Sequence, residues 1–131
     1  MQQNYQEAID ICSELLTSGL YEQVAQSGQA EDARAFRAEA RLLMATAMHY
    51  AAAAYEDIVR LLSFAMDAPP SVQKDVYFTL AVVQLSFGHS KEAKDSMENS
   101  LKLIEDQLKS NPHDENLIRQ QDEANEFLRQ I

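Results

Sequence analysis

Few side chains in this 131-residue chain are of the types that catalyse reactions or bind metals. The three histidines, His49, His89 and His113, are far apart in the sequence and form no metal-ligand spacing such as HxxxH. Cys12 is the sole cysteine, and nothing in the sequence around it predicts an activated nucleophile. The chain also lacks a glycine-rich phosphate loop and a GxSxG nucleophile elbow. We therefore expect a protein that is not an enzyme and that needs no cofactor.

Pairs of neighbouring carboxylates are the remaining candidates for a metal site. Glu56-Asp57 and Asp114-Glu115 fall at expected helix starts, where negative side chains complement the positive end of the helix dipole. Asp122-Glu123 falls on an expected polar helix face, where charge promotes solubility. We interpret all three pairs in this way and predict no metal site.

The charge balance restricts the classes of partner. The net charge is −10 and the isoelectric point is about 4.6. Binding to nucleic acid or to an anionic membrane surface needs concentrated Lys and Arg, so both are disfavoured. A basic or amphipathic protein partner fits the charge better, although the acidity is more simply explained as a means of keeping a helical protein soluble.

Several features favour a cytoplasmic protein. The lone Cys12 excludes an intramolecular disulfide and fits a reducing compartment. The chain does not open with a secretory signal pattern. The longest nearly uncharged stretch, residues 42–55, is too short to span a bilayer, so we predict no membrane insertion.

The composition predicts an all-α fold. Helix-forming Ala, Leu, Glu, Gln and Lys dominate, while only 3 Gly and 3 Pro are present. We expect about seven helices in one domain that covers residues 1–131. It divides into an N-terminal helical segment (1–28), two helix pairs (31–70 and 71–109) and a C-terminal capping helix (112–131). The N-terminal segment holds a helix over roughly residues 5–17 and a short one over 20–26.

The helix that begins near Ala30 has apolar residues on two faces. One face carries Phe36, Ala40 and Leu43, and the other carries Ala38 and Ala45. A helix of this kind is expected to be buried on two sides. An unbroken helix through the alanines at 51–54 would be unusually long, so we predict a turn in this stretch, with a continuous helix as the alternative. The spacing of the repeat resemblance given below places this turn near Ala53-Ala54.

Proline, glycine and capping residues predict the other boundaries. Pro69-Pro70 ends one helix, and Ser71 is the expected N-cap of the next. Gly88 marks a tight turn, after which Ser90 is the expected cap of a helix that runs to about Lys109. Asn111 followed by Pro112 predicts the start of the last helix, with proline at its first position.

Residues 75–101 and, more weakly, residues 42–70 share one spacing of large and small residues. The first match rests on Tyr77, Leu80, Ala81, Gly88 and Ala93, with Met97 after them. The second rests on the following positions: Leu42, Ala45, Thr46, Tyr55, Leu62, Ala65 and Pro70. This spacing resembles that of a tetratricopeptide repeat, in which small residues let two helices approach and large ones fill the groove to the next repeat. Departures include Gln84 at an aromatic position, and a generic helical bundle is the alternative.

The resemblance implies a right-handed stack of antiparallel helix pairs, in which the first helix of each pair lines a concave groove. The residues that would line the groove are Leu43, Met44, Ala47, Tyr50, Phe78, Val82 and Leu85. This apolar set would suit an amphipathic helix or an extended apolar peptide. The alternative is that these residues are core, covered by the N-terminal helices.

We therefore expect a non-enzymatic adaptor or scaffold that binds a protein segment. A second hypothesis uses the same apolar surface for homo-oligomerisation within a larger complex. A third is a small acidic chaperone of the secretion type, which shares the size, charge and helical repeats.

Overall fold

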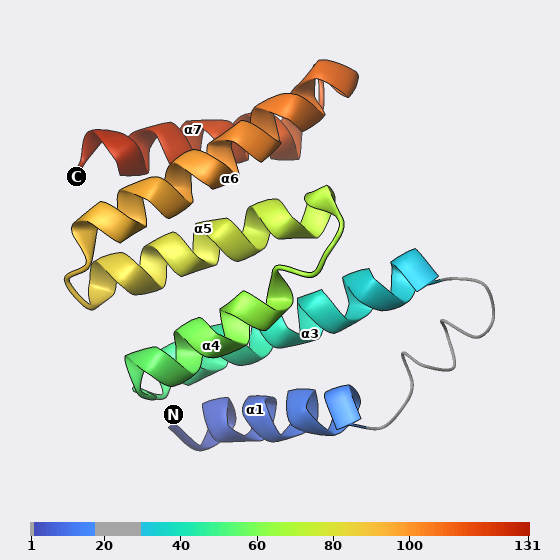
Figure 1. Cartoon of the computed structure of the whole chain (residues 1–131), viewed down its shortest axis with the longest axis vertical. Helices are drawn as coiled ribbons and strands as arrows, with labels where there is room; N and C mark the ends of the chain where they lie inside the picture. Colours follow the sequence, from blue (N-terminus) through green and yellow to red (C-terminus); the bar gives the residue numbers. More distant parts are fainter. Residues whose placement is uncertain (1, 18–29) are drawn as a thin grey trace. The chain divides into compact units, whose positions relative to one another are not determined.

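The chain folds into α-helices that end at the predicted breaks. The computed structural model describes residues 2–17 and 30–131. Its helices, drawn in Figure 1, are α1 (Gln2–Thr17), α3 (Ala30–Tyr50), α4 (Tyr55–Ala65), α5 (Pro70–Ser86), α6 (Ser90–Ser110) and α7 (Glu115–Arg129). No strand occurs within these two ranges, which confirms the all-α prediction for them. The short helix predicted over 20–26 lies outside the described residues.

The alanine-rich stretch after α3 forms the predicted turn and is not a continuation of the helix. Ala52 has a φ of 62°, in the left-handed region that non-glycine residues seldom adopt. The backbone N–H of Ala53 donates to the carbonyl of Met48 at 2.9 Å, which closes the end of α3. Ala54 is extended and α4 begins at Tyr55. Gly88 makes the corresponding turn between α5 and α6 with a φ of 85°.

Three predicted helix caps are wrong. α5 begins at Pro70, so Ser71 lies inside its first turn, because proline is already set for the first helical position. Ser90 is the first residue of α6 and does not cap it. The cap of α7 is Asp114, whose carboxylate accepts from the backbone N–H groups of Asn116 (3.0 Å) and Leu117 (3.1 Å).

Asn111 does not cap α7 as predicted but lies at the C-terminal end of α6. It ends α6, and its N–H donates to the carbonyl of Gln107. Residues 111–114 then form a turn in which the N–H of Asp114 donates to the Asn111 carbonyl at 3.2 Å. Both Asn111 and Asp114 are good capping residues, and the sequence favoured Asn111 because a proline follows it.

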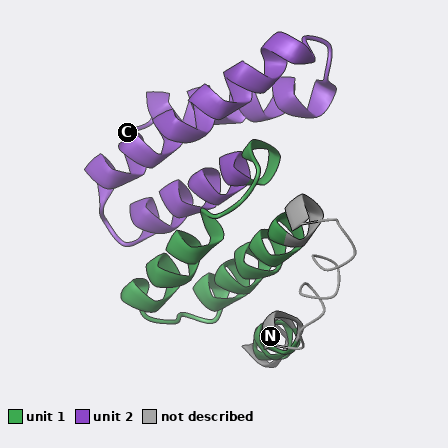
Figure 2. Cartoon of the chain, turned by 45° about the vertical axis from the view of Figure 1, so that its right-hand side comes forward, with its two compact units in different colours: residues 1–72 green, residues 73–131 purple. Residues whose placement is uncertain are grey.

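The chain divides into two units, residues 1–72 and 73–131, coloured green and purple in Figure 2. In the first unit, α3 packs against both α1 and α4. Of the two apolar faces predicted for this helix, Ala38 and Ala45 are fully buried, whereas the other face is buried only in part: Ala40 is buried but Leu43 is 62% exposed. Ile58, Leu62 and Ala65 of α4 complete this core. Alanine at these contacts allows the helix backbones to approach closely.

The second unit is built on α5, α6 and α7. A fully buried cluster joins one residue of each helix: Ala81, Met97 and Ala124. Burying these apolar side chains supplies the main stabilising term, at roughly 25 cal/mol per Å² removed from water.

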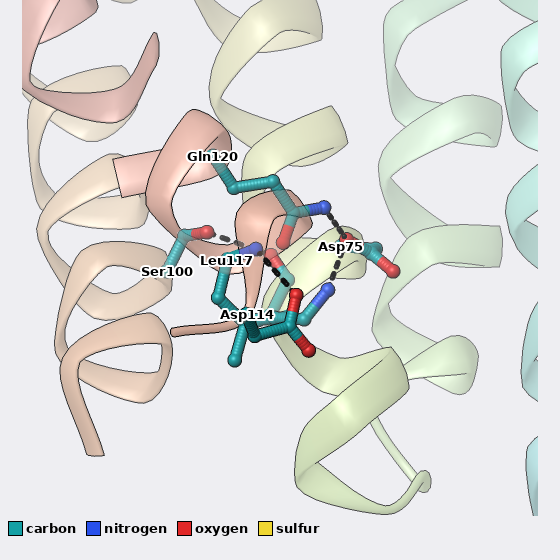
Figure 3. A network of polar contacts seen from close by, with 6 residues as sticks. Asp75, Ser100, Asp114, Leu117 and Gln120 are labelled. Carbon is teal, nitrogen blue, oxygen red and sulfur yellow. Dashed lines mark hydrogen bonds and ion pairs between the residues drawn. The ribbon is translucent and has the colours of Figure 1, made fainter. Parts of the chain in front are cut away.

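Polar contacts fix the arrangement of the second unit further. Ser96 on α6 donates to the side-chain oxygen of Gln84 on α5 at 2.6 Å. Asp75 of α5 accepts from Gln120 of α7 at 3.1 Å and from Lys74 at 2.9 Å (Figure 3). These bonds connect α5 to both of its neighbours, and they are directional, so they also fix the rotation of each helix.

Candidate functional site

The strongest candidate site in the first unit is an apolar groove between α1 and α3. Its cavity of about 250 Å³ is lined by Ala8, Leu43, Thr46, Ala47 and Tyr50, which we call the α1–α3 groove. The side chains of Leu43 and Tyr50 are large and apolar or aromatic, yet they are 62% and 64% exposed. Exposed residues of this size gathered at a cavity mark binding surfaces more often than scattered single ones do.

Helical spacing places these groove residues together. Leu43, Ala47 and Tyr50 are four and three residues apart, so they lie along one face of α3. Thr46 lies beside them, and its hydroxyl donates to the carbonyl of Leu42 at 2.9 Å. Because that bond occupies the hydroxyl proton, the groove is less polar than its composition suggests. The ring of Tyr50 lies 6.0 Å from that of His49, centroid to centroid.

Met44 was predicted to share the groove with Leu43, but it lines a different cavity. Met44 lines a cavity of about 220 Å³ between α3 and α4, with Met48 and Phe64 among its other lining residues. Successive residues on a helix point about 100° apart, which explains how neighbours in sequence face different cavities beside α3. Arg41 contacts Phe64, one of the residues that line this cavity: its guanidinium lies 5.6 Å from the Phe64 ring centre and donates to the Phe64 carbonyl at 3.0 Å.

The predicted groove residues of the second unit differ in how far they are buried. Val82 is 39% exposed on α5, whereas Leu85 is half-buried. Phe78 is half-buried and packs against the cluster of Ala81, Met97 and Ala124. Phe78 therefore contributes to the core of the unit as well as to its surface.

Phe78 also lines the largest of the cavities described here, about 530 Å³ between α5 and α7. The other lining residues are Asp122, Glu123, Glu126, Phe127, Arg129 and Gln130, and we call this site the α5–α7 pocket. The prediction from the sequence did not include these partners. Asp122 and Glu123 were assigned to a solvated face of the capping helix. The sequence feature that could have indicated this pocket is the mixture of apolar and acidic residues in the last helix.

The residues considered for chemistry are dispersed in the structure. His49 is half-buried on α3, while His89 and His113 are exposed near helix ends. Glu56 and Asp57 lie in the first turn of α4, as expected for charges that complement the helix dipole. Within residues 2–17 and 30–131, no group of three His, Cys, Asp or Glu side chains could hold a metal ion.

Comparison of this chain with family models, with curated proteins and with solved structures gave no match. Among the described helices, none combines the length and the apolar character that crossing a bilayer requires.

Proposed function

We propose that this chain is a non-enzymatic protein-interaction module that binds the apolar face of a partner's amphipathic helix in the α1–α3 groove. The observation that carries the proposal is the exposure of Leu43 and Tyr50, at 62% and 64%, on one face of α3 beside Ala8 of α1. A partner that covered them would remove two large side chains from water, each worth about 1.5–3 kcal/mol when fully buried.

The shape of the groove suits a helix as the occupant. Leu43, Ala47 and Tyr50 form a strip along α3, with the small Ala47 between two large residues. Ala47 itself is buried, so the strip has a low point flanked by two raised side chains. A ridge of side chains on an approaching helix can lie in such a depression.

Ile11 extends the same apolar surface along α1. It is 58% exposed and lies three residues after Ala8, so the two share a face of the helix. An amphipathic helix that docks on Leu43 and Tyr50 would have a second row of apolar contacts available on α1.

We also propose that the helix pairs α3–α4 and α5–α6 are tetratricopeptide-like repeats. The small residues Ala45, Ala65, Ala81 and Ala93, which carry the resemblance, are all fully buried, as close helix packing within such repeats requires. The turns at Ala52 and Gly88 give the two pairs similar connections, which also supports the proposal.

The test replaces the two exposed groove residues without disturbing the core. Leu43→Gln with Tyr50→Gln should keep the helical circular-dichroism signal and reduce capture of a bound partner from native extract about tenfold. Ile118→Gln is the matched control, because Ile118 is an exposed apolar residue of α7 outside the groove. Hydrogen exchange of the complex should show slower exchange along α1 and α3. Unchanged capture by the double variant would contradict the proposal.

Homo-oligomerisation through the same groove predicts a different result. Light scattering of the purified chain over a concentration series would then show self-association that Leu43→Gln abolishes. That outcome would replace the partner-binding proposal with the self-assembly hypothesis.

A further inference from the structure

The floor of the α5–α7 pocket is aromatic and held in place by the core. Phe78 and Phe127 both line the cavity, and both pack against the fully buried cluster of Ala81, Met97 and Ala124. Each side chain is only half-buried, so part of it stays accessible from the cavity. Fixed aromatic rings provide a surface for an apolar chain or for a cation, because the face of the ring carries negative charge.

The acidic side chains that line the pocket outnumber the basic ones. Glu126 is already paired at the end of α7: one oxygen accepts from Nε2 of Gln130, which follows the helix, at 3.0 Å, and the other lies 3.1 Å from Arg129 Nη2. Arg129, the only base that lines the pocket, is therefore already paired. The charges of Asp122 and Glu123 remain available.

Neither of these two carboxylates has a strong partner. Asp122 is exposed and, among the described residues, it forms no ion pair or hydrogen bond. Glu123 lies 3.8 Å from Arg119 Nε, and both side chains are more than half exposed. An ion pair of that length and exposure adds little stability, so Arg119 can be exchanged for a better partner at low cost.

We propose that the α5–α7 pocket binds a basic segment of a partner protein through an arginine side chain. The aliphatic stem of the arginine would lie on Phe78 and Phe127, and its guanidinium would reach Asp122 and Glu123. Arginine fits this combination better than lysine, because its planar group both stacks on aromatic rings and bonds carboxylates in pairs. The charge complementarity between this rim and a basic segment, and not the apolar area, selects the occupant.

This inference goes beyond the proposed function, because it uses the second unit and a different partner chemistry. A failure of Leu43→Gln with Tyr50→Gln to reduce capture of a partner from native extract would therefore leave this proposal standing. The two proposals could also apply to two segments of one partner.

The experiment is a calorimetric titration of the full chain with a synthetic peptide in which arginine alternates with leucine and alanine. A matched peptide carries citrulline, which has the shape of arginine without its charge. We expect the arginine peptide to bind in the micromolar range and the citrulline peptide about tenfold more weakly. The binding should also weaken with added salt. No binding of the arginine peptide would overturn the proposal.

The variant Asp122→Asn with Glu123→Gln locates the binding to the pocket. It should weaken the arginine peptide about fivefold or more, since it removes both available charges. The matched control is Asp95→Asn with Glu98→Gln, which makes the same charge change at exposed positions of α6 outside the pocket. The control should change the affinity less than about twofold. An equal loss in the two double variants would mean that the acidic chain attracts the peptide non-specifically, and the pocket would be excluded.

A third variant tests the aromatic floor. Phe127→Leu keeps an apolar side chain at the pocket but removes the ring, so the arginine peptide should bind about threefold more weakly, with unchanged helical content. Leu43→Gln with Tyr50→Gln should leave the affinity for this peptide unchanged. If only the groove variant loses affinity, the basic partner binds the first unit, and the assignment to the α5–α7 pocket is wrong.

Discussion

The hydroxyl of Ser100 on α6 donates a hydrogen bond of 2.7 Å to the backbone carbonyl of Lys74 on α5 (Figure 3). Ser100 has no exposed surface, and Lys74 is only 8% exposed. Position 100 therefore needs a side chain that is both small and able to donate, because a larger one would push the two helices apart.

Substitution at Ser100 should separate these two requirements. Ser100→Ala removes the hydrogen bond but not the close approach, and we expect the free energy of unfolding to fall by about 1 kcal/mol. Ser100→Leu adds volume at a fully packed contact and should cost about 1–3 kcal/mol. Urea denaturation followed by circular dichroism measures both. Asn99→Leu, at the exposed neighbouring position, is the control. Equal effects of leucine at 99 and 100 would contradict the close approach of α5 and α6.

The buried hydrogen bond between Ser96 and Gln84 predicts a measurable coupling. Both residues are buried, and the hydroxyl of Ser96 lies 2.6 Å from the Gln84 oxygen. In a double-mutant cycle of Ser96→Ala and Gln84→Met, the two changes should be coupled by about 1 kcal/mol in the free energy of unfolding. Additive effects would mean that the bond does not stabilise the folded chain.

The start of α7 provides a test of the cap that the structure assigns. Asp114→Ala removes the acceptor of two backbone N–H groups, so it should lower the free energy of unfolding by about 1 kcal/mol. Asp114→Asn should cost much less, because asparagine caps nearly as well. Asn111→Ala should stay within about 0.5 kcal/mol of the wild type. A larger loss of stability for Asn111→Ala than for Asp114→Ala would mean that Asn111 caps the last helix, as the sequence predicted.

The two left-handed turn residues should respond in opposite directions to an exchange of alanine and glycine. Ala52 has a φ of 62°, so Ala52→Gly relieves strain and should raise the free energy of unfolding by about 0.5–1 kcal/mol.

Gly88 has a φ of 85°, and a Cβ added there would meet no atom within 4 Å. Gly88→Ala should therefore cost only the backbone strain, about 1 kcal/mol. Both substitutions are measured by urea or thermal unfolding. If alanine were accepted at 88 without loss, the backbone there would have to differ from the turn described.

The sequence predicted the helical class and most of the helix boundaries because those depend on local chemistry. Proline cannot continue a helix and glycine readily adopts the left-handed conformation, so Pro69-Pro70 and Gly88 marked helix ends. The length limit on helices predicted a further turn in the alanine-rich stretch after Tyr50. The prediction from the sequence was wrong where two nearby residues have the same preference for capping a helix. Asn111 and Asp114 are equally good caps, and only the path of the chain out of α6 decided between them.

The candidate sites were predicted only in part, because periodicity shows which residues share a helix face but not what lies opposite that face. Leu43 and Tyr50 could be placed on one side of α3 from their spacing, but not beside Ala8 of α1. Met44 was grouped with Leu43, yet the two line different cavities, since the positions of α1 and α4 decide which face of α3 forms which cavity.

Phe78 and Phe127 show most clearly the difference between what the sequence predicts and what the packing of helices decides. The sequence by itself predicted that Phe78 lies on an apolar helix face. Only the tertiary structure brought the two rings to one pocket and placed Asp122 and Glu123 at its rim. The physical reason is that contacts between distant segments depend on how whole helices pack, which no local propensity encodes.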